Sequence, residues 1–237
     1  MIVFLIAVLV IFTGIFWLFS GRHKRQLIRW RRSLELDHHQ AVFENLYARA
    51  DGFQLSKSAR QGKDAIEYVY GEIDFESFIA LLSLCKPDSN SIFYDLGSGA
   101  GKAVLACAMV FNIRKSCGIE LFENLHLCAE GQRQHLTSLA KYADKAQVIE
   151  FIQADFLDIP LSDANLVFVN ASAWFGEFWE KTSYHLEQLK PGAIVISTSK
   201  PLVSSAWQTR HITSVNMSWG VVNAYIQQRL ASNNSAT

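Results

Sequence analysis

Hydrophobic and polar positions alternate along this chain in blocks that predict both strands and helices. Short apolar runs that end in polar or glycine residues are typical of buried parallel strands, and they cover 92–94, 116–119, 148–153, 166–169 and 193–197. Apolar residues recur at helical spacing over 75–82 and 178–189. Two later runs, 211–217 and 219–227, predict an antiparallel pair. Strands that alternate with helices favour an α/β fold, a doubly wound and mostly parallel sheet.

The N-terminal segment departs from this alternation. Residues 2–19 carry no charge, and this is about the minimum length that crosses a hydrocarbon core. Basic residues follow the run, beginning with Arg22, Lys24 and Arg25, whereas a cleavable signal peptide has its positive charge in front. Positive charge favours the cytoplasmic side. The pattern predicts a single-pass transmembrane helix over 1–20, with the rest of the chain facing the cytoplasm; a peripheral or packed apolar helix is the alternative.

The remaining chain divides into three parts. Residues 21–50 are predicted to be a basic juxtamembrane segment and helical linker, with a helix over 31–50, and residues 51–230 the main domain. Within that domain, the polar stretch 51–64 with its two glycines predicts a loop. Asp74 is a plausible N-cap for the helix that follows it. The Ser- and Asn-rich residues 231–237 predict a disordered tail.

Composition and charge narrow the classes of partner. The formal net charge is zero, which gives no global electrostatic argument for a nucleic-acid partner. The cysteines Cys85, Cys107, Cys117 and Cys128 lack metal-ligand spacing, and we interpret them as buried free thiols in a reducing compartment. No metal site is predicted.

The sequence FYDLGSGAGK, residues 93–102, carries the first sign of a ligand site. An apolar strand ends at Asp95, and Gly97, Gly99 and Gly101 lead into a helix that opens at Lys102. Glycines allow the backbone to approach a ligand, and a helix N-terminus offers free N–H groups. A dinucleotide fingerprint would need glycine at position 102, so this motif alone leaves a sharp turn without a ligand as an alternative.

Two further strand ends make a nucleoside ligand the stronger interpretation. Glu120 ends the next strand, at a suitable spacing along the sequence from the glycine motif. A carboxylate at that position is able to accept hydrogen bonds from two ribose hydroxyls. Asp155 and Phe156 follow the third strand, where a carboxylate and an aromatic ring suit an adenine amino group and its ring face. Suitable chemistry at three successive strand ends is more specific than any one of these signals.

Together with these motifs, the runs VYGEIDFE, DLGSGAGKAVL, GIE, ADFL, FVN and SKP resemble the Dot1-like lysine methyltransferases. The resemblance covers roughly residues 56–229. It implies a Rossmann-like class I methyltransferase sheet of seven mostly parallel strands in the order 3-2-1-4-5-7-6, with S-adenosylmethionine (SAM) as cofactor and a protein that carries the target lysine as substrate. Combined with the N-terminal segment, it implies a membrane partner and a catalytic domain that faces the cytoplasm.

The resemblance also implies roles for individual residues. Asn170 would orient the target amine, and Tyr70 belongs with it in the catalytic set; both Tyr70 and Glu72 lie in a loop that covers SAM. The implied cofactor-binding residues are Glu72, Asp95, Gly97, Gly99, Gly101, Lys102, Glu120, Asp155 and Phe156. The implied substrate channel comprises Trp174, Phe175, Ser199, Trp219 and Tyr225.

Three departures from the family pattern keep other functions open. Lys102 stands where the family usually has Gln, Ile73 replaces a frequent Thr, and the run after Asn170 is one residue longer. The basic DNA-contacting tail of eukaryotic members is absent, so neither a nucleosome substrate nor a nucleic-acid partner is expected. A small-molecule or lipid methyltransferase and a non-catalytic scaffold with the SAM fold are the alternatives to a protein lysine methyltransferase.

Overall fold

The computed structural model describes residues 22, 24–60, 65 and 68–231, and the chain separates by its internal contacts into two units, Met1–Ala41 and Val42–Thr237. The predicted transmembrane span, residues 1–20, lies outside the described residues, as does the predicted disordered tail from residue 232. Within the part of the chain that is described, no helix is both long and apolar enough to cross a membrane. In the first unit, the backbone bends at Glu35 (φ 48°), directly before helix α2 (Leu36–Tyr47) begins.

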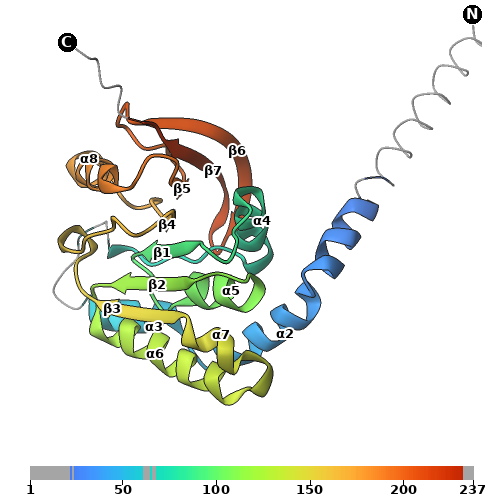
Figure 1. The fold of residues 1–237 in the computed structure, drawn as a ribbon. Helices are drawn as coiled ribbons and strands as arrows, with labels where there is room; N and C mark the ends of the chain where they lie inside the picture. The colour runs from blue at the N-terminus through green and yellow to red at the C-terminus, as the bar shows by residue number, and fades with distance from the viewer. Residues whose placement is uncertain (1–21, 23, 61–64, 66–67, 232–237) are drawn as a thin grey trace, which may run out of the picture. The chain divides into compact units, whose positions relative to one another are not determined.

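The second unit is built on one seven-stranded sheet in the order β3-β2-β1-β4-β5-β7-β6, as the resemblance predicted. Figure 1 shows β3, β2, β1 and β4 side by side, with β7 and β6 at the far edge. The first five strands are parallel, whereas β7 is antiparallel to both β5 and β6. The strands are β1 (Ile92–Leu96), β2 (Lys115–Glu120), β3 (Ile149–Gln153), β4 (Leu166–Val169), β5 (Ile194–Thr198), β6 (Trp207–Met217) and β7 (Gly220–Arg229).

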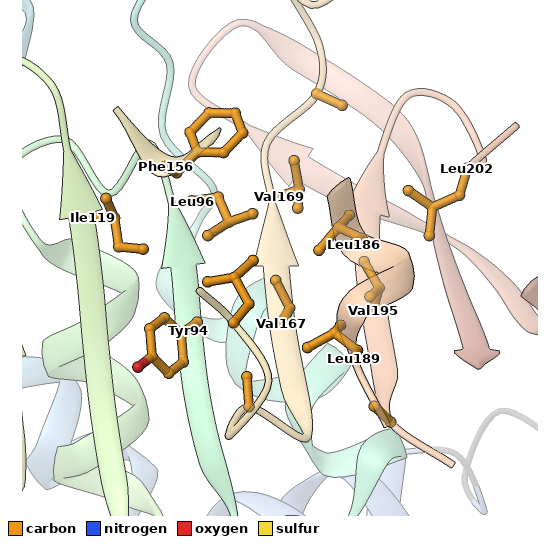
Figure 2. Close-up of a cluster of buried hydrophobic side chains, with 14 of the residues drawn as sticks. Tyr94, Leu96, Ile119, Phe156, Val167, Val169, Leu186, Leu189, Val195 and Leu202 are labelled. Carbon is orange, nitrogen blue, oxygen red and sulfur yellow. The ribbon is translucent and has the colours of Figure 1, made fainter. Parts of the chain in front are cut away.

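Helices cover both faces of this sheet because alternate residues of each strand point to opposite sides. On one face, Tyr94, Leu96, Val167 and Val169 pack with residues from the α8 side, including Leu186, as Figure 2 shows. On the other face, α4 supplies Phe78, whose ring packs on those of Phe93 and Phe168. The helices are α3 (Gly52–Ala59), α4 (Phe75–Cys85), α5 (Lys102–Val110), α6 (Glu123–Ser138), α7 (Ala143–Gln147) and α8 (Gly176–His185), with short 3-10 turns at Ala140–Tyr142, Phe156–Asp158 and Leu186–Gln188.

Helix α4 confirms its predicted start, because the Asp74 side chain accepts a hydrogen bond from Ser77 N at 2.9 Å. The prediction of a loop over 51–64 is wrong for residues 52–59, which form α3. Asp51 caps this helix by accepting from Gln54 N, and Ser56 is buried against the domain, so capping and burial outweigh the polar composition. Cys107 and Cys117 are buried as predicted, whereas Cys85 and Cys128 are half-buried.

The register of the parallel strands brings their carboxyl ends together. Leu96 pairs with Ile119 on one side and with Val169 on the other, so Asp95, Glu120 and Asn170 lie at one edge of the sheet. The segment Tyr70–Asp74, which we call the cover segment, is held against the β6–β7 turn. Ser218 N donates to Glu72 O at 2.8 Å, and Asp74 N donates to Asn216 O at 2.9 Å. This pairing fixes a chain segment beside the strand ends.

Candidate functional site

The glycine turn after β1 forms the base of a pocket. Gly97 and Gly99 have left-handed backbone conformations, with φ of 74° and 54°. A Cβ atom at Gly99 would lie 2.5 Å from Cε2 of Tyr70, so only glycine leaves room for that ring. Gly101 (φ 81°) faces the protein interior instead, since a Cβ there would lie 2.5 Å from Cζ of Phe151. The first two glycines therefore line the pocket, and Gly101 shapes the turn into α5.

Glu120 at the end of β2 is a buried carboxylate held by backbone amides. Its Oε2 accepts from Gly99 N and its Oε1 accepts from Phe122 N, both at 2.8 Å. Burial raises the pKa of this carboxyl, and the backbone hydrogen bonds oppose that shift. An ionised carboxylate has about four lone-pair sites, so each oxygen keeps capacity for a further donor. The group is fixed in place and has free acceptor capacity, as two ribose hydroxyls require.

Asp95 lies deeper in the same pocket and has an unusual protonation equilibrium. Burial, with a smaller contribution from the charge of Glu120, raises the pKa of its carboxyl from 3.8 to about 8. At neutral pH the side chain therefore favours its protonated form. A cation close to it would favour the ionised form and lower this pKa. The site is consequently suited to a positively charged ligand.

The cover segment packs on the glycine turn through Tyr70 and lines the same pocket. Tyr70 Oη donates to Glu72 Oε1 at 2.8 Å, and Lys102 Nζ donates to Glu72 Oε2 at 2.6 Å. Burial, followed by the charge of Glu72, raises the pKa of the Tyr70 phenol well above its ordinary value, so the phenol stays protonated and acts as a donor. On the outer side, the indole of Trp219 packs directly on Gly71, where a Cβ would lie 1.8 Å from Cζ3.

Aromatic side chains form the wall beyond β4. Phe156 is buried and stacks on Trp174 with ring centroids 5.1 Å apart and an interplanar angle of 19°. Phe178 packs edge-on against Trp174 at 5.2 Å. Asp155, predicted to contact adenine, lines the pocket while its Oδ1 accepts from Leu157 N at 2.9 Å. This part of the pocket offers a flat apolar wall beside a carboxylate.

Asn170, directly after β4, lines the pocket and contacts both the cover segment and a cluster of hydroxyl groups. Its Nδ2 donates to Gly71 O at 3.0 Å, whereas its Oδ1 accepts from Thr198 Oγ1 at 2.8 Å and from Ser172 Oγ at 3.0 Å. These partners fix the orientation of the amide, because a flipped amide would place its oxygen against the Gly71 carbonyl. Ser172 Oγ also lies 2.8 Å from Ser199 Oγ, so it has a second partner available.

Four of the five residues predicted for the substrate channel lie outside the pocket lining. Trp174 is part of the lining. Phe175 is exposed, with Lys200 Nζ 3.7 Å from its ring centroid, and Lys200 also donates to the Trp174 carbonyl. Tyr225 lies on β7, where it pairs with Ser197 and Ile212. Ser199 Oγ lies within hydrogen-bond distance of Ser172 Oγ, which itself donates to Asn170. Trp219, in the β6–β7 turn, packs on Gly71 of the cover segment.

The structure brings most of the predicted cofactor residues into one pocket. The predicted residues that line it are Tyr70, Glu72, Asp95, Gly97, Gly99, Lys102, Glu120, Asp155, Phe156, Asn170 and Trp174. Sequence reasoning missed further lining residues, among them Tyr68, Ser98, Phe122 and Phe178. Tyr68 and Phe122 pack edge-to-face at 5.1 Å. Tyr68 directly precedes the VYGE run and Phe122 lies two residues after Glu120, whereas Phe178 had no comparable signal.

The chemistry of this lining fits a SAM-type cofactor. Glu120 offers acceptors for a ribose, Phe156 and Asp155 suit adenine, and Asp95 and Glu72 suit cationic groups. Ser98 Oγ is buried without a hydrogen-bond partner, so the pocket also holds an unsatisfied polar atom at its base. Together, the glycine backbone, the carboxylates and the aromatic rings supply the polar groups and the apolar surface that an adenosyl group with a charged side chain needs.

Comparison with known proteins places this chain in a defined group. The family model described as "Histone methylation protein DOT1" matches residues 54–235. The chain is similar to the H3 lysine-79 specific histone-lysine N-methyltransferase of Candida glabrata (27% identity, 58% of this chain and 22% of the relative). It is also similar to a protein-lysine N-methyltransferase of Saccharolobus islandicus (26% identity, 49% of this chain and 67% of the relative). The matched region is thus about a fifth of the fungal relative's length.

Solved structures support the same fold. An RNA methyltransferase from Salinibacter ruber in complex with S-adenosyl-L-homocysteine aligns with a TM-score of 0.53 and 25% identity, over 66% of this chain and 92% of that chain. A putative methyltransferase, yhhF of Escherichia coli, aligns with the same TM-score at 18% identity, over 66% of this chain and 87% of that chain. The second likeness concerns the fold alone. Both agree with the predicted Rossmann-like sheet.

The predicted location, a single-pass membrane protein whose catalytic domain faces the cytoplasm, is corrected. The similar proteins are named for histone H3 and protein lysines, and none of the helices within the described residues is able to span a membrane. The prediction rested on the apolar composition of residues 2–19, which lie outside the described residues. We therefore withdraw the membrane location and the membrane partner.

Proposed function

The chain belongs to the DOT1 family of histone methylation proteins, and we propose that it transfers a methyl group from SAM to a lysine ε-amine of a protein. The family resemblance drawn from the sequence motifs is thereby confirmed. Relatives in a fungus and in Saccharolobus islandicus are named as lysine N-methyltransferases of proteins, which supports this substrate class.

One observation carries the proposal: the amide of Asn170 lines the pocket and joins the cover segment to a cluster of hydroxyl groups. Asn170 Nδ2 donates to the carbonyl of Gly71, which lies between Tyr70 and Glu72 in the cover segment. The Oδ1 atom of the same amide faces the hydroxyl groups of Ser172 and Thr198. A polar group suited to an amine therefore belongs to the lining of the pocket that the glycine turn and the aromatic wall also form.

Bound in this pocket, SAM would supply an electrophilic methyl group on a sulfonium sulfur. Glu120 would hold the ribose, and Phe156 and Asp155 the adenine. Asp95 would stabilise positive charge in its ionised form. Trp174 and Phe178 exclude water from the wall, which strengthens the electrostatic contacts inside. Positioning and desolvation by these residues are the chain's main contribution to the rate.

Asn170 is the residue that orients the target amine. Both acceptor positions of Oδ1 are used by hydroxyls, but Ser172 Oγ is able to turn toward Ser199, 2.8 Å away, and free one of them. An amide oxygen accepts an N–H without adding a net charge, so it aims the lone pair of a neutral amine and raises the pKa of that amine less than a carboxylate would.

The amine must lose its proton before transfer, and the site favours that loss. Burial lowers the pKa of a lysine because the charged form is penalised. Lys200, which contacts the carbonyl of Trp174, already experiences this effect, since burial lowers its pKa. A target lysine buried against the aromatic wall of the pocket would be affected in the same direction. Tyr70 stays protonated and donates to Glu72, so its proposed catalytic role is positioning of the cover segment.

The test uses the full chain with isotope-labelled SAM and separate protein, lipid and small-molecule fractions, followed by peptide mass spectrometry. Histone H3 is included as one protein probe, and Asn170→Ala runs in parallel. Label on lysine residues, lost in Asn170→Ala, is the expected result. Label in lipid or small molecules alone would replace the proposal with the alternative methyltransferase. Absence of SAM binding by calorimetry would leave a non-catalytic scaffold.

A further inference from the structure

A strained turn follows directly after β5. Ser199 has a left-handed backbone conformation, with φ of 68°, which is disfavoured for a residue that carries a Cβ atom. Such strain persists only where the surrounding structure holds it, and it is concentrated at functional sites. Glycine would adopt the same conformation without strain, so a serine at this position calls for a physical reason.

Three hydrogen bonds hold this turn in its conformation. Ser199 N donates to Asn223 O on β7 at 2.7 Å, and Lys200 N donates to Thr198 O at 2.8 Å. Ser197 Oγ, on β5, donates to Lys200 O at 2.8 Å. The backbone on both sides of Ser199 is therefore fixed, and so is the direction in which its side chain leaves the turn.

The turn contacts the segment Asn170–Phe175, which we call the β4 loop, at two places. Near the start of the loop, Ser199 Oγ lies 2.8 Å from Ser172 Oγ. Near its end, Lys200 Nζ donates to the carbonyl oxygen of Trp174. Because the loop is held at both places, the fold itself sets the spacing between the two serine hydroxyls.

The hydroxyl of Ser172 decides whether Asn170 is able to accept a further hydrogen bond. Oδ1 of Asn170 has two lone pairs, and Thr198 Oγ1 and Ser172 Oγ use them at 2.8 and 3.0 Å. A hydroxyl has one proton, so Ser172 donates to one acceptor at a time. Its oxygen lies 2.8 Å from Ser199 Oγ and 3.2 Å from Thr198 Oγ1, which makes Ser199 the nearer alternative acceptor.

We propose that Ser199 is a positioning residue for methyl transfer: its strained backbone holds a hydroxyl that accepts the hydrogen bond of Ser172 when the target amine binds. One lone pair of Asn170 then becomes free and accepts an N–H of the neutral amine. This inference rests on the proposed function, in which Asn170 orients the amine. Ser199 acts through Ser172, whereas the resemblance implied that it lines a channel for the lysine. The competing interpretation is a turn that only connects β5 to β6.

The test compares two variants that separate the hydroxyl from the strain. Ser199→Ala removes the hydroxyl and keeps the strain, whereas Ser199→Gly removes the hydroxyl and relieves the strain. Since the relief offsets the greater freedom of glycine in the unfolded chain, Ser199→Gly should keep a Tm close to that of wild type. A loss of activity in this variant is then not a loss of fold.

The full-length variants are assayed for SAM affinity by calorimetry and for kcat at saturating SAM. The acceptor is histone H3, or the protein that takes up label in the test above. We expect unchanged SAM affinity, because Ser199 does not belong to the described lining of the pocket. The kcat should fall by about 3- to 10-fold in both variants, as the loss of one neutral hydrogen bond to the amine predicts.

A second background shows whether Ser199 acts through Ser172. In Ser172→Ala the hydroxyl that occupies Asn170 is absent, so adding Ser199→Gly should change kcat by only about 1-fold, because the two effects share one contact. Ser183→Ala is the control for the loss of a buried serine hydroxyl, since its Oγ donates to Trp179 O at 2.8 Å outside the described pocket lining. It should lower the Tm and leave kcat unchanged.

Each outcome decides between the interpretations. A Ser199→Gly protein with the kcat of wild type would overturn the inference, because the hydroxyl would then have no part in the reaction. An equal loss of kcat with and without the Ser172 hydroxyl would also overturn it, as would a joint fall in Tm and SAM affinity, since both indicate a turn that acts only on the fold. A wild-type protein that binds SAM but methylates no lysine would instead refute the proposed function on which the inference rests.

Discussion

Replacement of Gly99 by alanine tests the packing on which the pocket depends. Gly99 has φ of 54°, and a left-handed conformation costs an alanine about 1–2 kcal/mol. The new Cβ would lie 2.5 Å from Cε2 of Tyr70, so this ring must move. It has little space to do so, because its hydroxyl packs on Gly52, where a Cβ would lie 2.4 Å from Oη, and its ring packs edge-on against Phe53.

Moving Tyr70 also breaks its hydrogen bond to Glu72, which adds about 1–2 kcal/mol. We therefore expect Gly99→Ala to lower the free energy of unfolding by about 2–4 kcal/mol. In a domain of this size that corresponds to a fall in Tm of roughly 5–15 °C. Because Tyr70 and Glu72 line the cofactor pocket, the rise in Tm that saturating SAM produces in wild type should be lost as well.

The assay is thermal unfolding with and without SAM, and Gly131→Ala is the matched control. Gly131 lies inside α6, and a Cβ there would meet nothing within 4 Å. Alanine at a helix interior is favoured by about 1 kcal/mol over glycine, so this variant should be slightly more stable and keep the SAM-induced shift. A Gly99→Ala protein with the Tm and SAM response of wild type would refute the packing argument.

Three further predictions address single groups. Stability should fall as pH rises from about 4 to about 8, since the folded protein keeps the Asp95 proton (pKa about 8) that the unfolded chain loses near 3.9; denaturant unfolding of Asp95→Asn should give a flatter profile, and an unaltered slope would contradict this. Asn170→Asp replaces the donor to Gly71 O by an acceptor, which should cost about 1–3 kcal/mol in urea unfolding; equal midpoints would argue against that hydrogen bond. Asp74→Ala removes the cap that accepts from Ser77 N and should cost about 1 kcal/mol in the same assay, with a neutral result excluding the cap.

Local chemistry determined which residues end the strands of this protein. The apolar run before Asp95, the glycines after it and the acid at Glu120 each follow from preferences that act over a few residues. Parallel strands bring their carboxyl ends to one edge, so the cofactor side of the pocket was predictable once the strands were recognised. The resemblance of the motifs added the strand order that the structure has.

Contacts between distant segments decided the rest. The helix α3 forms because Asp51 caps it and Ser56 is buried. The polar stretch 51–64 has no hydrophobic periodicity from which either contact could be predicted. Phe178 lines the pocket from a helix that carries no motif. Gly101, part of the same motif as Gly99, faces Phe151 instead of the pocket. Such differences depend on which neighbour occupies the space beside each residue.

The sequence by itself thus determined the fold class, the strand ends and the family, because these depend on short-range preference and on motifs. Only the tertiary structure decided that Gly71 accepts from Asn170 and that Glu72 pairs with Lys102. These partners are separated by 99 and 30 positions along the chain. A hydrogen bond or ion pair across such a distance requires the whole sheet to be assembled, since only the register of its strands brings the two groups within reach.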